Sequence, residues 1–326
     1  MRCIISSSNN PYFNLATEDY FLRNSDSELF LLYINEPCIV AGKHQNILSE
    51  INLGFALKHK LCLARRISGG GTVYQDSNNL NFSFIHNCAN LEKINFQRFT
   101  YPVFKALKDF GLPVEFSGRN DLLLGDKKIS GNAMHIFKNR VLSHGTLLYN
   151  SDLKRLSESL RNNPDRYIDK SIKSVRSKVT NISDYSDNTQ SISDFTKFIY
   201  NNITQKFESP DYMSLNGLET AQIEQLVKDK YETWEWIFGY SPKYTFKNSL
   251  QLSDKFVHFE IEVEKGIIRK IKTDSEINDD PVYRSIFETL NNSRHDFGEI
   301  VKLLEKNINL IHNTKYSITE FCNLLF

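Results

Sequence analysis

The chain has 326 residues, of which 40% are hydrophobic and 24% are charged, and its formal net charge is +1. This length and composition are typical of a globular protein with one large domain or two ordinary ones, able to bury a core without disulfides. The near-neutral charge argues against a nucleic-acid-binding or membrane-surface protein, and no apolar run approaches the roughly 20 residues that span a bilayer.

The first half of the chain mixes predicted helices and strands. Helical apolar spacing predicts helices at residues 14–22 and 96–110. We expect Pro102 to kink the second helix near its beginning or to mark its true start, and Gly111 to end it. Short apolar runs separated by turn residues predict strands, which lie at residues 29–34, 38–41 and 81–85.

Residues 114–148 predict an antiparallel meander, because short apolar runs alternate with turn residues. The expected strands lie at residues 114–116, 121–124, 127–129, 133–137 and 141–148. The pairs Gly125-Asp126 and Lys138-Asn139 are suited to hairpin turns. Such a sheet buries one face, which the helices can cover.

Residues 150–182 differ from the rest in being polar and basic. They are too many for a simple connection, and long loops of this kind are usually lids, binding loops or disordered segments. We expect a lid here. Two helices are predicted to follow, at residues 193–207 and 220–231.

The C-terminal part changes character after about residue 246. The run F-V-H-F-E-I-E-V-E-K-G-I-I-R alternates strictly, which predicts a hairpin with Lys265-Gly266 as its turn. Helices are expected at residues 297–305 and 317–325, the second opened by a capping box of Ser317 and Glu320. We therefore expect a main domain at residues 1–245 and a small α+β accessory domain at residues 246–326.

The most informative stretch is R-R-I-S-G-G-G-T-V-Y from Arg65, in which two arginines precede three consecutive glycines. Glycines let the backbone approach a ligand closely, and arginines beside them indicate a phosphate or carboxylate partner. The run is neither G-x-x-x-x-G-K-[ST] nor G-x-G-x-x-G, so on the glycines alone a tight structural turn and a ligand loop both stay open. A second basic cluster holds Arg119, Lys127 and Lys128, and strand alternation lets only one of the two lysines face a given site.

Several motifs together resemble the lipoate-protein ligase A family. In order, they are N-L-A-T-E-D, A-G-K-H-Q-N, A-R-R before S-G-G-G-T-V-Y-Q-D, G-R-N-D-L, D-K-K-I-S-G-N-A, S-H-G-T-L-L and S-V-R-S-K-V-T-N. They extend over residues 14–181, and W-E-W-I-F-G-Y from Trp234 resembles the family's exit from the catalytic domain. The resemblance implies an α+β fold with a mixed, largely antiparallel sheet flanked by helices, as in biotin and lipoate ligases and class II aminoacyl-tRNA synthetases.

The reaction that the resemblance implies has two steps. Lipoate attacks the α-phosphate of ATP, with Mg²⁺ as the expected metal, to give lipoyl-adenylate and pyrophosphate, and a lysine of an acceptor domain then takes the lipoyl group. The implied acceptors are the lipoyl domains of 2-oxoacid dehydrogenase E2 subunits and the glycine cleavage H protein. No nucleic-acid or membrane partner is expected, and the protein is expected to be a cytoplasmic monomer.

The resemblance also implies roles for individual residues. Lys128 is the expected catalytic residue, in contact with lipoate and phosphate. The expected nucleotide-binding residues are Arg66, Gly71, Thr72, Val73, Tyr74, Asp121, Lys128, Ser130, Lys178 and Asn181. The expected lipoate-binding residues are Gly42, His44, Ser68, Gly69, Gly70, Lys128, His144 and Gly145. The basic loop at residues 173–181 would fold over the adenylate.

Residue chemistry supports part of this assignment. Adenylation brings a carboxylate against a triphosphate, so the site needs fixed positive charge, which Arg66 and Lys128 can supply. Asp76 and Asp121 could bind Mg²⁺ or orient basic residues. His144 could be the base for the acceptor lysine or a structurally satisfied histidine, and the same choice between ligand and structure is open for His44.

Alternatives within and outside this fold stay open at this point. One is a lipoyl transferase using preformed lipoyl-adenylate, another an ATP-independent octanoyl transferase, and a third a non-catalytic module that binds acceptor domains. Ile67 and Lys43 stand where many family members have arginine, which bears on triphosphate affinity. The five cysteines are widely spaced without a C-x-x-C pair, which indicates a reducing compartment, and Cys38, Cys62 and Cys88 resemble core residues rather than nucleophiles. The N-terminus is expected to be neither a signal nor a transit peptide.

Overall fold

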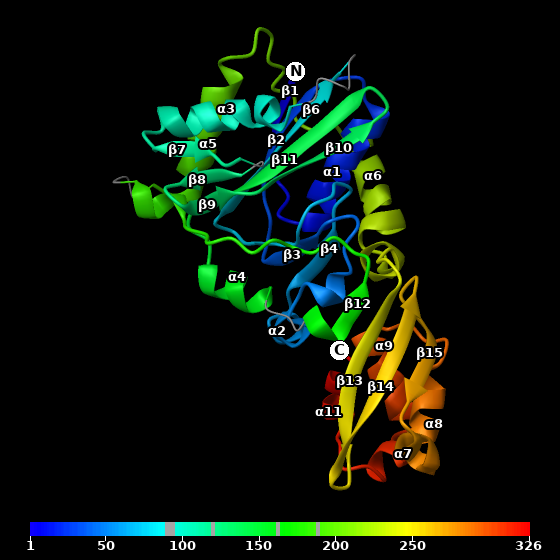
Figure 1. Cartoon of the computed structure of the whole chain (residues 1–326). Coiled ribbons are helices and arrows are strands. Elements are labelled where there is room, and N and C mark those ends of the chain that lie inside the picture. Colours follow the sequence, from blue (N-terminus) through cyan, green and yellow to red (C-terminus); the bar gives the residue numbers. More distant parts are fainter. Residues whose placement is uncertain (89–94, 119–120, 161–163, 187–189) are drawn as a thin grey trace. The chain divides into compact units, whose positions relative to one another are not determined.

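A computed structural model describes residues 1–88, 95–118, 121–160, 164–186 and 190–326 (Figure 1). The chain forms two compact units. The first consists of Met1–Lys43, Leu61–Glu158 and Ser174–Thr233, and the second of His44–Lys60, Ser159–Lys173 and Trp234–Phe326. The boundary expected at residues 245 and 246 falls inside one strand, β13 (Tyr244–Leu252). Among the described helices, none is long and apolar enough to cross a membrane.

A five-stranded sheet is the centre of the first unit, with the strand order β1-β2-β6-β11-β10. Its strands are β1 (Arg2–Ile5), β2 (Leu29–Ile34), β6 (Asn79–Asn87), β10 (Asn132–Phe137) and β11 (Arg140–Leu148). Only β1 and β2 pair in parallel, and the other neighbours are antiparallel. The predicted mixed, largely antiparallel sheet flanked by helices is confirmed.

Helices cover both faces of this sheet (Figure 1). On one face α3 (Phe96–Asp109) and α5 (Ile192–Thr204) close a core that includes the buried rings of Phe30, Phe82 and Phe84. On the other face lies α1 (Pro11–Asn24), with α6 (Gly217–Leu226) packed against it. Side chains alternate along each strand, so residues that follow these phenylalanines face α1 instead.

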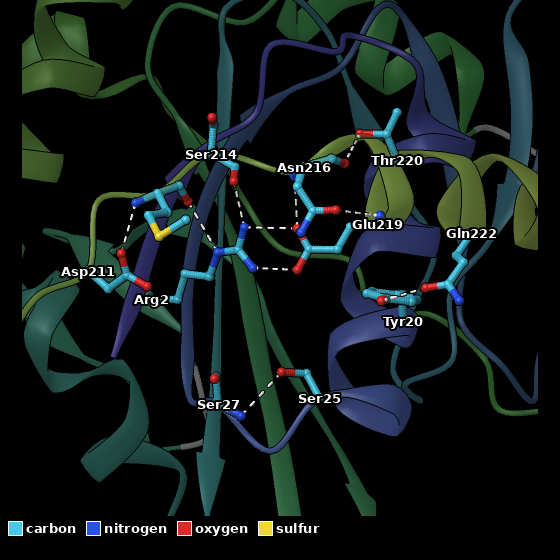
Figure 2. A network of polar contacts seen from close by, with 11 residues as sticks. Arg2, Tyr20, Ser25, Ser27, Asp211, Ser214, Asn216, Glu219, Thr220 and Gln222 are labelled. Atoms are coloured by element: carbon cyan, nitrogen blue, oxygen red, sulfur yellow. Dashed lines mark hydrogen bonds and ion pairs between the residues drawn. The ribbon is translucent and has the colours of Figure 1, made fainter.

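A hydrogen-bonded network ties the start of α6 to strand β1 (Figure 2). The Arg2 guanidinium makes a bidentate ion pair with Glu219, at 2.5 and 2.9 Å, and also donates to the Ser214 carbonyl at 2.5 Å. Glu219 is at the same time the third residue of a capping box with Asn216, so strand β1 is tied to the start of α6. Helix α6 in turn packs against α1, which itself contacts β6 and β11 of the sheet.

Two three-stranded sheets complete the strands of the first unit. One has the order β4-β3-β5, with β3 (Cys38–Ala41), β4 (Cys62–Arg65) and β5 (Val73–Gln75). The other has the order β7-β8-β9, with β7 (Val114–Phe116), β8 (Leu122–Leu124) and β9 (Lys127–Ser130). The predicted single meander at residues 114–148 is therefore wrong, because the chain leaves the small sheet after β9 and enters the large one with β10.

The second unit contains a four-stranded antiparallel sheet in the order β12-β13-β14-β15. Besides β13, the strands are β12 (Tyr167–Asp169), β14 (Lys255–Glu264) and β15 (Ile267–Thr273). The predicted hairpin is confirmed, since Lys265 and Gly266 both have positive φ, 52° and 72°. Its helices are α7 (Ser275–Asp279), α8 (Pro281–Leu290), α9 (Phe297–Lys306), α10 (Ile308–His312) and α11 (Ile318–Leu324).

Other details correct or confirm the expectations. Pro102 lies inside α3 and does not mark its start, while Gly111 follows the helix with φ of +95° as expected. The capping box of Ser317 and Glu320 is confirmed. The polar stretch at residues 150–182 contains regular structure, with β12 and a helix, α4 (Leu153–Ser159). The remaining short elements are α2 (Leu53–Lys58), 3-10 turns at Ile47–Ser49, Pro164–Arg166 and Ile182–Tyr185, and π-helical turns at Val227–Tyr231 and Glu235–Gly239.

A histidine is buried in the core of the second unit. The Tyr244 hydroxyl donates to Nδ1 of His295 at 2.6 Å, and His295 Nε2 donates to the Leu325 carbonyl at 2.7 Å, which fixes the neutral tautomer. The ring of Phe326 stacks on the imidazole with 4.4 Å between centroids. Burial lowers the pKa of His295 to about 4.

We expect the second unit to lose stability as the pH falls from about 6.5 to about 4. In this window an unfolded histidine binds a proton and the folded one does not, so the free energy of unfolding falls with pH, by about 3 kcal/mol in full. Urea titrations followed by tryptophan fluorescence measure this, because both tryptophans, Trp234 and Trp236, belong to the second unit. His295→Gln should remove most of the pH dependence, and His312→Gln, at an exposed position, should preserve it. An unchanged dependence in His295→Gln would contradict the assignment.

Candidate functional site

The glycine loop, residues 68–72, connects β4 to β5 and is organised around Arg66. The guanidinium donates from Nη2 to the carbonyls of Gly69 and Gly71, at 2.6 and 2.7 Å. It also donates from Nη1 to the Val40 carbonyl at 3.1 Å and from Nε to Ser68 Oγ at 3.0 Å. Burial lowers the pKa of Arg66 to about 10, so the side chain stays cationic at neutral pH. Arg66 is thus a buried charge that fixes the loop from within.

The orientation of the loop carbonyls determines where its N–H groups point. In a trans peptide the C=O and the following N–H point in opposite directions, and no described peptide bond is cis. Because the carbonyls of Gly69 and Gly71 face Arg66, the N–H groups of Gly70 and Thr72 face away from it. Gly70 has φ of +88°, a conformation that favours glycine. Backbone N–H groups that point away from a buried cation in this way are available to an anion or to a hydrogen-bond acceptor.

A segment from the predicted lid contacts the glycine loop. Ser174 Oγ accepts a hydrogen bond from the Thr72 N–H at 2.9 Å. A Cβ added to Gly71 would lie 2.9 Å from the same oxygen, so this glycine gives the segment its room. The N–H group that faces the anion-binding side of the loop is therefore already a donor to the lid.

Lys128 forms the centre of a second group of predicted residues. Its Nζ lies 3.0 Å from Asp121 Oδ1, and both side chains are about one quarter exposed. A Cβ on Gly131 would lie 3.1 Å from both Cε and Nζ of Lys128, so the ammonium group lies over this glycine. Lys127 is exposed, as expected for its neighbour on the same strand.

The lid also pairs with the main chain of Lys128. The Lys128 N–H donates to the Lys178 carbonyl at 2.8 Å, and the Thr180 N–H donates to the Lys128 carbonyl at 3.1 Å. Lys128 and Val179 form a parallel bridge between the two segments. The end of the lid is therefore anchored beside the lysine, while the side chain of Lys178 is 81% exposed.

The glycine loop and the residues around Lys128 meet at the junction between β9 and β10. The Thr146 N–H donates to the Gly131 carbonyl at 3.1 Å, and Gly145 is paired with Asn132 in the large sheet. A Cβ on Gly70 would lie 3.9 Å from the Cβ of Ala133, two residues after Gly131. The glycine loop and Lys128 thus lie against the same short stretch of chain.

Buried polar residues lie behind the glycine loop. Ser68 Oγ is 2.6 Å from His144 Nε2, and His144 Nδ1 is 2.8 Å from Glu18 Oε2. Glu18 comes from α1, and its other oxygen accepts from Tyr33 at 3.0 Å and from Ser83. Among the predicted site residues, Arg66, Ser68, the loop glycines, Thr72 and His144 are therefore joined by contacts.

Other predicted residues have structural partners elsewhere. Asp76 accepts from the backbone N–H groups of Asn78 at 3.0 Å and Asp152 at 2.9 Å. Asn181 forms two hydrogen bonds with the backbone of Ser151. Val73 is half-buried, and Tyr74 and Ser130 are buried.

The residues around the A-G-K-H-Q-N motif are divided between the units. The Gly42 carbonyl accepts from Arg65 at 3.0 Å, and the Lys43 N–H donates to the Ser68 carbonyl at 2.8 Å, which places Gly42 beside the glycine loop. His44 belongs to the second unit and is exposed. Arg119 lies outside the described residues. No group of three or more His, Cys, Asp or Glu suited to a metal ion occurs in the part of the chain that is described.

Sequence reasoning missed three contributors to the site, Glu18, Gly131 and Ser174. Glu18 and Gly131 stand inside motifs that carried the family resemblance, so the signal was present without a role. Ser174 likewise begins the S-V-R-S-K-V-T-N motif, but its partner, a backbone N–H 102 residues away in sequence, could not be inferred from it.

Comparisons with a family model and with known proteins all match the chain to lipoate-protein ligases. Residues 10–204 match the family model of the lipoyl protein ligase A/B catalytic domain. The chain is 40% identical over 306 residues to lipoate-protein ligase 1 of Staphylococcus aureus, covering 93% of each chain. It is 38% identical over 269 residues to lipoate-protein ligase LplJ of Bacillus subtilis, covering 81% of each.

Solved structures share the fold. A putative lipoate protein ligase of Thermoplasma acidophilum with bound lipoic acid matches with a TM-score of 0.63 at 24% identity, covering 73% of this chain and 98% of that one. LipL1 of P. falciparum in complex with lipoate matches with a TM-score of 0.59 at 24% identity, covering 96% and 97%.

Proposed function

The chain belongs to the lipoate-protein ligase family, and from that premise we propose that it joins lipoate to a lysine of an acceptor lipoyl domain in two steps. In the first, a lipoate carboxylate oxygen attacks the α-phosphorus of ATP and pyrophosphate leaves. In the second, the acceptor amine attacks the carbonyl carbon of lipoyl-adenylate, AMP leaves, and the amine loses a proton as the amide forms. It is an ATP-dependent ligase.

The observation that carries this proposal is the glycine loop ordered by Arg66 beside Lys128. The loop with Arg66 supplies N–H donors and a positive charge, and Lys128 supplies a second positive charge. These groups are fixed before the reaction, in which negative charge accumulates on the phosphates. Arg66 donates to the loop carbonyls, so we assign it a role through the loop N–H groups and its charge rather than through direct phosphate contact. Lys128, whose side chain is about one quarter exposed, is the residue we assign to lipoate and the α-phosphate.

We also propose that the reaction requires Mg²⁺ and that the phosphates of ATP would supply most of the ligands of this ion. Asp121 already pairs with Lys128, and Asp76 accepts two backbone N–H groups, so neither offers an unengaged carboxylate. This fits an ion that is bound largely by phosphates and water, with at most one or two protein carboxylates, and that would neutralise charge on the triphosphate.

Further assignments rest on family membership and composition. We propose E2 lipoyl domains and the glycine cleavage H protein as acceptors, catalysis by residues 1–245, and an accessory role for residues 246–326. We also propose a monomer in the cytoplasm, and the cytoplasmic location is in keeping with five cysteines that are all free thiols. The remaining site assignments from the resemblance belong to the same proposal. They are nucleotide binding by Val73, Tyr74, Ser130, Lys178 and Asn181, and lipoate binding by Gly42 and His44.

The experiment that tests the function is pyrophosphate release by the purified protein with lipoate, ATP and Mg²⁺, followed by addition of an apo lipoyl domain. Release and then lipoylation of the domain supports a complete ligase. Modification only with synthetic lipoyl-adenylate would make the protein a transferase, and modification from an octanoyl donor without ATP would make it an octanoyl transferase.

Cleavage by trypsin after Arg176 is expected to slow about tenfold or more when lipoate and ATP are both present. Arg176 is exposed, and adenylate formation should hold the lid closed, since a ligand stabilises the state that it binds. The rate is measured by mass spectrometry of timed digests. Cleavage after Lys255, exposed at the start of β14, is the control and should not change. Equal cleavage after Arg176 with and without ligands would contradict a lid.

A further inference from the structure

We propose that Asp169 is a positioning residue for the lid, because its carboxylate anchors residues 170–173, here called the lid base. This inference rests on the proposed function, since it concerns how lipoyl-adenylate is retained between the two steps of the reaction. It also gives a structural role to Gln45 and Asn46 of the A-G-K-H-Q-N motif, which hold the same segment.

The carboxylate of Asp169 gathers four hydrogen bonds at the point where β12 ends and the lid base begins. One oxygen accepts from the Ser171 N–H at 2.9 Å and from the Ser171 hydroxyl at 2.6 Å. The other oxygen accepts from Lys173 Nζ at 3.1 Å and from Asn46 Nδ2 at 3.3 Å. A carboxylate that accepts from the N–H two residues later forms an Asx turn, so Asp169 sets the direction in which the chain leaves the strand.

Burial and charge make these hydrogen bonds depend on an ionised carboxylate. The side chain of Asp169 is 0% exposed, whereas that of Lys173 is 42% exposed. Burial alone would raise the pKa of Asp169, but hydrogen bonds from Ser171 and Lys173 hold this pKa below its ordinary value. Asp169 is therefore ionised at neutral pH, and an ionised carboxylate can only accept. A buried donor that loses such an acceptor is destabilised, so the four hydrogen bonds hold the lid base together.

The A-G-K-H-Q-N motif holds the main chain of the lid base as well. Gln45 Nε2 donates to the Ile172 carbonyl at 3.1 Å, and the Ile172 N–H donates to the His44 carbonyl at 3.4 Å. Gln45 and Asn46 are both buried. The motif residues from His44 onward and the lid base all belong to the second unit, so these contacts lie within one compact unit.

Strand β12 fixes the position of Asp169 itself. The strand ends at Asp169 and pairs with β13 in the four-stranded sheet. The ring of Tyr167 is buried, with its centroid 5.0 Å from that of Phe246. From Ser174 onward the lid belongs to the first unit, where its end pairs with the main chain of Lys128. The lid is thus anchored at both ends, and an anchored loop loses less conformational entropy when it closes over a ligand.

Retention of lipoyl-adenylate is the step at which this anchoring acts. The intermediate is a mixed anhydride, and water that reaches it gives lipoate and AMP. A lid with a loose base closes less often, so the intermediate escapes or is hydrolysed sooner. Arg66 and Lys128, which are assigned to adenylation, are held by contacts of their own. Asp169 therefore controls the lifetime of the intermediate rather than the rate at which it forms.

Asp169→Asn is the informative variant, because the amide has the shape of the carboxylate without its charge, and its nitrogen cannot accept. The protein is mixed with lipoate, ATP and Mg²⁺ without an acceptor domain, and pyrophosphate is followed in time. A rapid phase, stoichiometric with the enzyme, reports formation of the adenylate, and the slow phase that follows reports its loss. We expect the rapid phase to stay within about threefold of the native rate and the slow phase to rise on the order of tenfold or more.

Asp165→Asn is the matched control, because Asp165 is exposed and lies in the turn before β12. It makes the same change of charge and should leave both phases unchanged. Trypsin cleavage after Arg176 gives a second readout, since its protection by lipoate and ATP should shrink in Asp169→Asn and persist in Asp165→Asn. Should Asp169→Asn not fold, Ser171→Ala removes the hydroxyl donor at 2.6 Å and should raise the slow phase about threefold.

Two results would overturn the inference. One is a native slow phase in folded Asp169→Asn, or in Ser171→Ala where that variant replaces it. The other is a rapid phase that slows as much as the slow phase accelerates, because Asp169 would then act in adenylation itself. A native protein that releases no pyrophosphate would instead count against the proposed function.

Discussion

Replacing Lys128 with alanine is expected to slow lipoyl-adenylate formation on the order of a hundredfold or more, because losing one preorganised donor costs about 3 to 4 kcal/mol. The ammonium group is held by Asp121 at 3.0 Å and lies over Gly131, so its position is set before any substrate binds. Fixed charge of this kind needs no reorganisation during the reaction. The loss should therefore appear in the rate of pyrophosphate release at saturating ATP.

Lys127→Ala is the matched control for this variant. Lys127 precedes Lys128 on β9 and is exposed on the other side of the strand, so its removal changes net charge equally while leaving the site intact. Lys128→Arg should recover little, since the guanidinium is wider and the space over Gly131 is already close, at 3.1 Å. A near-native rate for Lys128→Ala would remove Lys128 from the catalytic assignment.

Strands with a strong local signal could be predicted to the residue. The bounds of β2 (Leu29–Ile34), β3 and β7 match the expectation, because each is an apolar run between turn residues. The same holds for the hairpin at Lys265-Gly266. Local chemistry decides these elements, and no distant partner is needed to recognise them.

Elements decided by long-range pairing could not be predicted in this way. Strand β12 (Tyr167–Asp169) has three residues in a polar stretch and exists because it pairs with β13, far along the chain. The prediction correctly made β10 and β11 neighbours but wrongly joined β7, β8 and β9 to the same sheet, since the sequence does not specify which neighbour a strand takes. Register and neighbours are tertiary properties.

The site residues also divide into features that local sequence predicts and features that depend on distant partners. Strand alternation separated Lys127 from Lys128, and the family resemblance gathered Arg66, Ser68 and His144 without relating them to one another. Neither could show that Arg66 turns back to the loop carbonyls, because its direction depends on Ser68, and that of Ser68 on a histidine 76 residues away. Glu18 completes the network, and the motif that contains it did not indicate that its side chain reaches His144.

Gly145→Ala is expected to destabilise the first unit by about 3 kcal/mol or more, at the upper end of overpacking effects. The added Cβ would lie 2.2 Å from Asn132 Oδ1, 2.6 Å from Phe82 Cζ and 3.0 Å from the Gly131 carbonyl oxygen. Phe82 is 0% exposed in the core, and the Gly131 carbonyl is held by the Thr146 N–H, so neither can move without cost. Urea unfolding followed by far-UV circular dichroism measures the change.

Gly217→Ala is the control for this substitution. Gly217 begins α6 and has no atom within 4 Å of an added Cβ, so alanine there should be neutral or slightly stabilising. Combining Gly145→Ala with Phe82→Leu should recover part of the loss, because the smaller side chain removes one clash. The resemblance assigned Gly145 to lipoate binding, whereas the close contacts assign it to packing. The two roles predict different results for Gly145→Ala. A variant of native stability with a raised KM for lipoate would favour substrate contact, whereas a loss of stability relieved by Phe82→Leu identifies a packing glycine that keeps His144 and Gly131 in register.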